Sequence, residues 1–236
     1  YTVGKHTLVA IEHLDGIRQA VPANTSFCAY ATELEELNAI YQQISDPSVL
    51  YMALLLHDID KPSPEHPYTG ADKARRIAME FGFNEIQRDA ICFLVREHKA
   101  MIELARYYQW DEDSIPEFQQ KVESLDRLMS LYLLTYCDSK ANGEQNFTSL
   151  DEDNLKRLYE LTRDRFVGRG EEQWYAYADA DEFHRFLHQM PVSYRITHSP
   201  KEIAVHIKLV KAVEAHGASV IHFVDKAGYT ELHLCG

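Results

Sequence analysis

The chain has 236 residues, of which 45% are hydrophobic and 26% charged, and its formal net charge at pH 7 is −13. These values are typical of a soluble globular protein with one large domain, or one domain and a small appendage. No apolar segment is long enough to cross a bilayer, and the negative charge argues against a nucleic-acid partner held through its phosphates. The four cysteines have no CxxC spacing. We therefore expect neither disulfides nor a thiolate zinc site, and a cytoplasmic location.

Helical periodicity dominates the chain and predicts an all-α bundle. The expected helices are residues 4–16, 30–45, 47–60, 68–81, 84–106, 114–141, 150–167, 171–189 and 200–215. We expect the 114–141 segment to be two helices with a break near Glu123 and Ser124. Because the chain begins at Tyr1 and not at a methionine, we also expect it to be a piece of a longer protein.

The pattern changes near the C-terminus. Ser199 and Pro200 are typical of a helix start, and after Gly217 the sequence alternates between apolar and polar residues in 219–224 and 229–234. Asp225–Gly228 lies between these segments and predicts a hairpin turn. We therefore divide the chain into a helical domain, residues 1–190, and a connector helix with a β-hairpin, residues 191–236. An isolated hairpin is marginal in water, so it either packs on the helical body or begins a second domain.

The first candidate site residues end an apolar segment. His57 and Asp58 follow residues 50–56, which are apolar on every side of a helix and predict a buried element. An ionised Asp58 there is costly unless it is paired or bound to a metal. Lys61 lies one turn further on and is a suitable partner, while Pro62 disfavours helix at Lys61 itself. On these residues alone, a buried histidine beside an aspartate paired with Lys61 explains the pattern as well as a metal site does.

Three more polar residues share the inward faces of predicted helices. The apolar stripe of residues 91–102 includes His98, the stripe of residues 131–141 includes Asp138, and His6 shares a face with Val9 and Ala10. Each residue alone is most simply a hydrogen-bonded core group. Taken with His57 and Asp58, they predict a metal site, because one ion would satisfy all of these groups at once. Imidazole and carboxylate ligands suit Mn, Fe, Mg or Zn.

The order of these residues resembles that of the HD superfamily of phosphohydrolases, which has an all-helical fold. Within it, the chain is similar to the HD domain of the bifunctional uridylyltransferases/uridylyl-removing enzymes that modify the PII nitrogen-signalling protein. The matching blocks are residues 1–8 (YTVGKHTL), 54–61 (LLLHDIDK), His66 with Gly70 and Ala71, 94–101 (LVREHKAM), and 131–138 (LYLLTYCD) with Ala141. Together they span about residues 1–170. The 190–194 and 199–213 segments resemble the connector that leads into ACT domains in that family, and the hairpin resembles the start of one.

The resemblance implies roles for seven residues. His6, His57, Asp58 and Asp138 are expected to bind a first metal ion. His66 and His98 match histidines that can hold a second ion, with Asp58 between the two. The resemblance also implies that Lys61 contacts the phosphate or the attacking hydroxide, and that the reaction removes UMP from a modified tyrosine of PII.

The chain also departs from the family pattern. Asp60 stands where glycine or alanine is usual, Glu97 replaces the first residue of a His-His pair, and the 62–65 loop lacks its glycines. Phe147 is the nearest aromatic residue where the family has a tryptophan after Ala141. Two alternatives therefore stay open: an HD hydrolase of small nucleotides or cyclic phosphodiesters, and a regulatory HD module without activity. No Gly-Ser plus Asp-x-Asp block is present, so we expect no uridylyl transfer by this chain alone.

Overall fold

The structure is a computed structural model. It describes residues 2–20, 33–61, 66–106, 110, 113–143, 145–167, 200–216, 220–226 and 229–235, with positions 185, 186, 189, 190 and 194 between them. The chain forms two compact units. One comprises Tyr1–Tyr108 and Ile115–Phe166, and the other comprises Gln109–Ser114 and Val167–Gly236.

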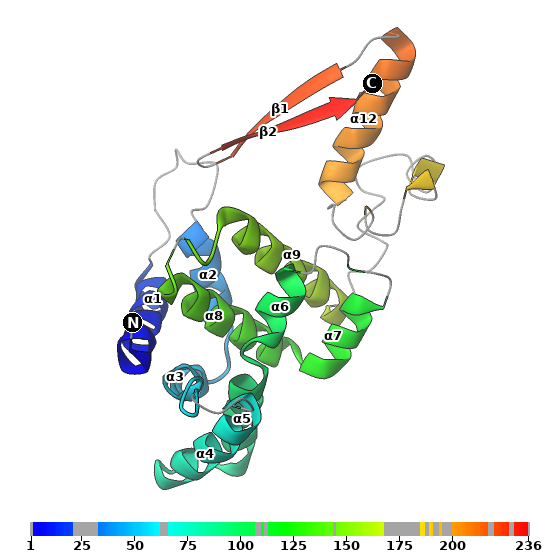
Figure 1. Ribbon diagram of the computed structural model, residues 1–236. Helices are drawn as coiled ribbons and strands as arrows, with labels where there is room; N and C mark the ends of the chain where they lie inside the picture. The colour runs from blue at the N-terminus through cyan, green and yellow to red at the C-terminus, as the bar shows by residue number, and fades with distance from the viewer. Residues whose placement is uncertain are drawn as a thin grey trace. The chain divides into compact units, whose positions relative to one another are not determined.

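The first unit is helical throughout its described part, which confirms the predicted all-α fold (Figure 1). Its helices are α1 (Val3–Gln19), α2 (Glu33–Tyr41), α3 (Pro47–Leu56), α4 (His66–Glu80), α5 (Glu85–Glu97), α6 (Ala100–Arg106), α7 (Ser114–Val122), α8 (Leu125–Ala141) and α9 (Ser149–Phe166). None of the described helices is both long and apolar enough to span a membrane.

Local sequence signals explain where several helices begin. Asp46 caps α3 by accepting a hydrogen bond from the Ser48 amide, and Pro47 occupies the first turn, where its missing N–H is not needed. The start of α8 is capped by Ser124, and the preceding Glu123 has a φ of 69°, in the left-handed region. A helix cannot continue through such a residue, so the predicted break near Glu123 and Ser124 is confirmed.

Three predicted helices end or break earlier than the periodicity indicated, and the first of them, over residues 30–45, ends at Tyr41. The 47–60 helix ends at Leu56, and the 84–106 helix is divided into α5 and α6 at His98 and Lys99. Neither of these last two breaks contains glycine, and the proline nearest to the one after Leu56, Pro62, comes five residues after His57. At both ends a histidine side chain bonds to a backbone carbonyl three residues earlier, which competes with the regular helical ladder.

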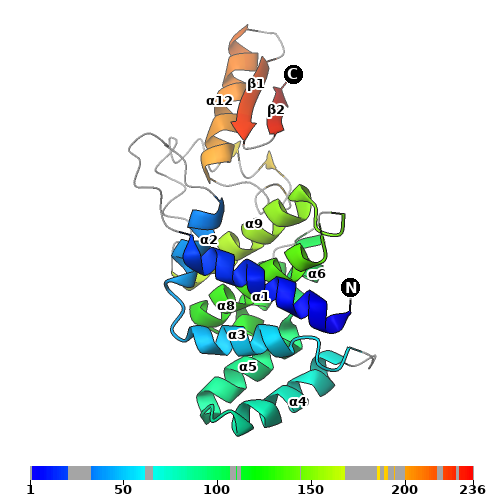
Figure 2. The same ribbon diagram turned by 90° about the vertical axis from the view of Figure 1, so that its left-hand side faces the viewer.

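The core of the first unit is built around α8. This helix contacts α1, α2, α3, α5, α6 and α9, and Figures 1 and 2 both show it among them. Most of its residues are buried, including Leu128, Leu131 and Leu134 with no exposed surface. By contrast, α3 is not buried on all sides as predicted, because Leu55 is 48% exposed. The central position of α8 means that a polar side chain on its inner face lies inside the unit.

The second unit contains a helix and a hairpin in its described part. Helix α12 (Pro200–His216) contacts the antiparallel strands β1 (Val220–Lys226) and β2 (Tyr229–Cys235), so the predicted hairpin is present. Both strands are longer than predicted. Residues 227 and 228 between them lie outside the described residues, as do the Ser199 cap and most of the predicted 171–189 helix. The division at residue 190 and the start of an ACT domain stay predictions.

Candidate metal centre

The site begins with a contact between two distant helices. His6, in the second turn of α1, and Asp138, in the last turn of α8, are 132 positions apart, yet His6 Nε2 lies 2.7 Å from Asp138 Oδ1. His6 is 5% exposed and the Asp138 side chain 16%. A buried carboxylate of this kind needs a partner, and the packing of α1 on α8 supplies one.

Two further histidines occupy equivalent positions at helix ends. His57 follows α3 and His98 follows α5, and each is 1% exposed. His57 Nδ1 lies 2.7 Å from the Leu54 carbonyl oxygen, and His98 Nδ1 lies 2.6 Å from that of Val95. A carbonyl only accepts, so Nδ1 carries the proton in both rings. In the neutral form of each ring, Nε2 therefore presents a lone pair, and this is the form that binds a metal.

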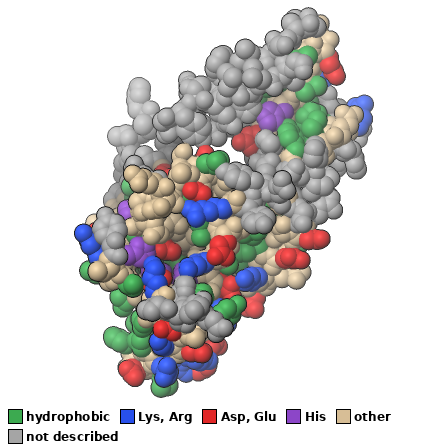
Figure 3. All heavy atoms as spheres, in the orientation of Figure 1, with side chains coloured by type: hydrophobic (Ala, Val, Ile, Leu, Met, Phe, Trp, Pro, Cys, Tyr) green, Lys and Arg blue, Asp and Glu red, His purple; other side chains and the backbone are tan. Residues whose placement is uncertain are grey.

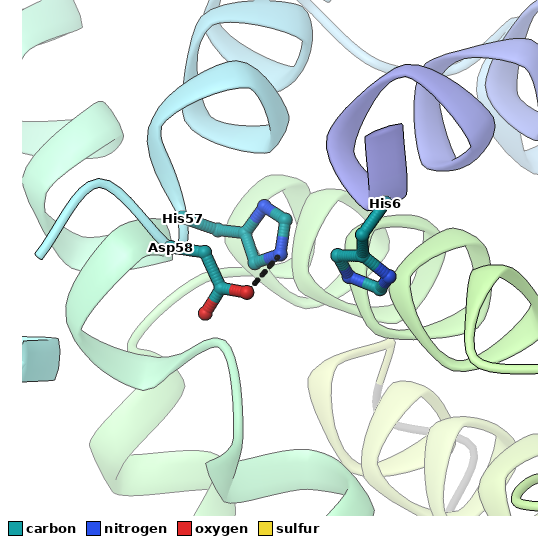
Figure 4. Close-up of side chains that lie close together, drawn as sticks. All are labelled: His6, His57 and Asp58. Carbon is teal, nitrogen blue, oxygen red and sulfur yellow. Dashed lines mark ion pairs between the residues drawn. The ribbon is translucent and has the colours of Figure 1, made fainter. Parts of the chain in front are cut away.

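The Nε2 atom of His57 faces two carboxylates. It lies 3.6 Å from Asp58 Oδ2 and 3.4 Å from Asp138 Oδ1. Figure 4 shows His57 between His6 and Asp58, with the Asp58 side chain on the turn that leaves α3. On the other side of this carboxylate, His98 Nε2 lies 4.0 Å from Asp58 Oδ1. The His57 imidazole thus lies next to two others, with its ring centroid 5.4 Å from that of His6 and 5.5 Å from that of His98.

Lys61 lies at the edge of this cluster. Its ammonium group donates to Asp58 Oδ2, while 46% of its side chain stays exposed. Asp58 itself is 4% exposed. The contact therefore joins the buried carboxylate to a cation that a ligand from solvent can reach.

The arrangement fits a divalent cation. One donor atom from each of His6, His57 and Asp58 lies within 4.8 Å of the others, and Asp138 joins them through its contacts with both histidines. The buried Nε2 of His57 has no hydrogen-bond partner among the described residues. An ion among these atoms would supply that partner, and two imidazoles with two carboxylates are a donor set for Mn, Fe, Mg or Zn.

The protonation states of His98, Asp58 and Asp138 agree with metal binding. Burial lowers the pKa of His98 to about 4, so this ring is neutral at pH 7. For Asp58 and Asp138, burial alone would raise the pKa, but Lys61 beside Asp58 and the two histidines beside Asp138 outweigh it and lower both values. Burial alone would lower the pKa of His57, but Asp138 and Asp58 outweigh it and raise that value. Both carboxylates are thus ionised, as metal ligands must be.

The structure brings five of the six predicted ligands together. His6, His57, Asp58, His98 and Asp138 converge, with Lys61 beside them, while the side chain of His66, at the start of α4, lies outside what the structure describes. Their roles as ligands stay predictions.

Two departures from the family pattern have structural partners. The Glu97 carboxylate lies 2.7 Å from Lys121 Nζ and 3.1 Å from Arg96 Nε. Asp60 Oδ1 lies 2.6 Å from Lys73 Nζ. Sequence reasoning missed both lysines, because no helical period or motif relates residues 13 or 24 positions apart on different elements.

The surface of the helical unit carries both signs of charge. In the face drawn in Figure 3, lysine and arginine side chains are interspersed with aspartate and glutamate. Together with the net charge of −13, this gives no support to a continuous basic surface on that face.

Comparison with known proteins assigns this arrangement to a family. Residues 28–131 match the family model of the HD domain. The chain therefore contains a region that matches the HD domain. The matched region of the HD domain includes His57, Asp58 and His98, while His6 precedes it and Asp138 follows it. HD domains are metal-dependent phosphohydrolases, which agrees with the convergent histidines and carboxylates.

Curated relatives extend the similarity beyond the HD region. A bifunctional uridylyltransferase/uridylyl-removing enzyme from Nitrosococcus oceani is 30% identical over 92% of this chain and 26% of its own length. The protein of the same name from Cereibacter sphaeroides is 34% identical over 69% of this chain and 17% of its own length. That from Zymomonas mobilis subsp. mobilis is 28% identical over 93% of this chain and 25% of its own length. The chain therefore spans about a quarter or less of these relatives.

Proposed function

We propose that this HD domain is a metal-dependent phosphodiesterase that removes UMP from a uridylylated PII signalling protein. The observation that carries the proposal is the convergence of His6, His57, Asp58 and Asp138 from α1, the end of α3 and α8. The named relatives are uridylyl-removing enzymes, which supports this substrate over other phosphate esters.

Each residue has a part that follows from its position. His6, His57, Asp58 and Asp138 would hold a divalent ion, which would supply an activated water and polarise a phosphoryl oxygen. The Nδ1 bond to Leu54 fixes the orientation of the His57 ring before any ligand arrives. His98 lies on the opposite side of Asp58, which is where a second ion would have to be held.

Lys61 is the group suited to contact substrate. Its ammonium is fixed on Asp58 at one side and open to solvent at the other, so it can stabilise the negative charge that builds up on the phosphoryl oxygens. Water adds to phosphorus, the bond from phosphorus to the tyrosine oxygen breaks, and the tyrosine leaves as a phenol with UMP as the other product. The half-exposed Lys61 can therefore contact both the buried metal site and a protein substrate that binds at the surface.

The decisive experiment measures UMP release from uridylylated PII by the Mn²⁺-loaded chain. Asp58→Ala should abolish metal binding and lower the rate at least about a thousandfold, because it removes a ligand and leaves Lys61 without its partner. Asp89→Ala is the control, since this carboxylate is exposed and pairs with Arg75 on the surface.

Retained activity in Asp58→Ala contradicts the proposal. Turnover of nucleotides or cyclic phosphodiesters with none of uridylylated PII favours a different HD hydrolase. A chain that takes up no stoichiometric divalent metal favours a regulatory module without activity.

A further inference from the structure

The turn that follows α3 carries the most critical side chains of the proposed site. Its backbone is held by two hydrogen bonds of short span, from the Ile59 amide to the Leu56 carbonyl and from the Lys61 amide to the Asp58 carbonyl, both 3.0 Å. A turn of this kind is not rigid by itself. The positions of Asp58 and Lys61 therefore depend on what packs against the turn.

Helix α4 provides that packing. A Cβ atom added at Gly70 would lie 3.7 Å from Ile59 Cγ2 and 3.9 Å from Asp60 Cβ, so the α4 backbone lies close against the turn. Lys73 is three residues further along the same side of α4, and its Nζ lies 2.6 Å from Asp60 Oδ1. The Asp60 side chain is only 17% exposed, compared with 43% for Lys73.

The turn thus contains two carboxylates with a different lysine on each. Lys61 donates to Asp58, and Lys73 donates to Asp60. Asp60 is the residue directly before Lys61, and a lysine side chain is long and flexible enough to exchange one carboxylate for another. Without Lys73, an ionised Asp60 would compete with Asp58 for Lys61 and would add negative charge beside the place where an anionic phosphate must bind.

We propose that Lys73 is a positioning residue that neutralises Asp60, so that Lys61 stays on Asp58 and faces the phosphate. This inference rests on the proposed function and deepens it, because it assigns a role to an ion pair outside the metal ligands. Lys73 could have either of two roles, and a mutation can distinguish them. A residue that only anchors the turn would affect metal binding, whereas one that neutralises charge affects the binding of the anion.

The experiment compares Lys73→Met with the unmodified chain. Three quantities are measured: the Kd of Mn²⁺ by calorimetry, the Kd of UMP for the Mn²⁺-loaded chain, and kcat and KM for bis(p-nitrophenyl) phosphate. We expect UMP binding and KM to worsen about tenfold, because the carboxylate that Lys73 no longer neutralises opposes the binding of an anion nearby. The Kd of Mn²⁺ should not increase, because a carboxylate that has lost its lysine attracts a cation and does not repel it.

Two further variants make the test specific. Asp60→Asn removes the charge that Lys73 neutralises, so it should restore UMP binding in the Lys73→Met background and have little effect alone. Lys156→Met is the matched control, because Lys156 is also 43% exposed and pairs with Glu36, away from the proposed ligands. It should leave all three quantities unchanged.

Two results would overturn the inference. One is unchanged UMP affinity in Lys73→Met, and the other is a loss of Mn²⁺ binding that Asp60→Asn fails to reverse. An unmodified chain that binds Mn²⁺ and UMP but hydrolyses no phosphodiester contradicts only the proposed function, and the affinities still decide the role of Lys73. An unmodified chain that binds no Mn²⁺ contradicts both.

Discussion

His57 and His98 show how one residue can serve structure and chemistry at once. Each ring uses Nδ1 to satisfy a carbonyl at the end of its own helix and directs Nε2 toward the same carboxylate, Asp58. The hydrogen bond selects the tautomer, and the helix end sets the direction of the ring. One ring thus both bonds to the end of its helix and offers a proposed ligand atom, so a change in the ring should affect both stability and metal binding.

The two uses of His57 can be separated by mutation. Asparagine can place its side-chain N–H where Nδ1 of histidine lies, so His57→Asn should keep the bond to Leu54 and lose only the Nε2 ligand. His57→Ala should lose both and should unfold with about 1 kcal/mol less free energy than His57→Asn, the usual value of such a hydrogen bond. Chemical denaturation and Mn²⁺ calorimetry on both variants test this. Equal stability of the two variants would contradict it.

At the scale of elements, the site depends on how α1, α3, α5 and α8 pack. Helical period alone placed His6, His98 and Asp138 on inward faces, because apolar neighbours three and four residues away determine which side of a helix is buried. The period could not show that α5 stops at Glu97, since a side-chain bond and not a breaker residue ends it. It also could not show Lys73 beside Asp60, because that contact exists only after α4 has packed on the turn.

A second polar contact between elements gives a pH-dependent prediction. Burial and a hydrogen bond with Glu152 of α9 raise the pKa of Glu33, at the start of α2, to about 7. The protonated form of Glu33 therefore stabilises the fold below its unfolded pKa, and this contribution is lost as the pH rises through about 7. Burial alone would raise the pKa of Glu152, but Glu33 and Lys140 lower it, so its own contribution is lost toward acidic pH.

Glu33→Gln isolates this effect, because glutamine keeps the donor at every pH. At pH 8 the variant should be more stable than the unmodified chain, by up to about 1 kcal/mol since Glu33 is partly exposed to solvent. At pH 5 the two should unfold alike. Thermal unfolding at both values measures the difference, with Glu117→Gln on the exposed side of α7 as the control. A stability gain that is the same at pH 5 and pH 8 would contradict the assignment.

At the scale of the whole chain, the metal site is where separate parts of the first unit meet. The proposed ligands are residues 6, 57, 58 and 138, so an ion bound by them would connect the N-terminal helix, the middle of the unit and its central helix. The unfolded chain cannot hold those residues together, so binding free energy adds to the stability of this unit. None of the described residues of the hairpin unit belongs to the proposed ligand set, so that unit should not respond.

Metal addition should therefore raise the melting temperature of the first unit alone. At a free Mn²⁺ concentration of about 100 times Kd, linkage adds about 2.7 kcal/mol, which corresponds to a shift of about 5–10 °C for a unit of this size. Asp138→Asn should remove the shift, because the amide still accepts from His6 but is a poor metal ligand. Asp164→Asn on α9 is the control and should retain the full shift. Because Asp138 lies outside the matched HD region, an unchanged shift in Asp138→Asn would exclude α8 from the site and limit the ion to ligands near α1 and α3.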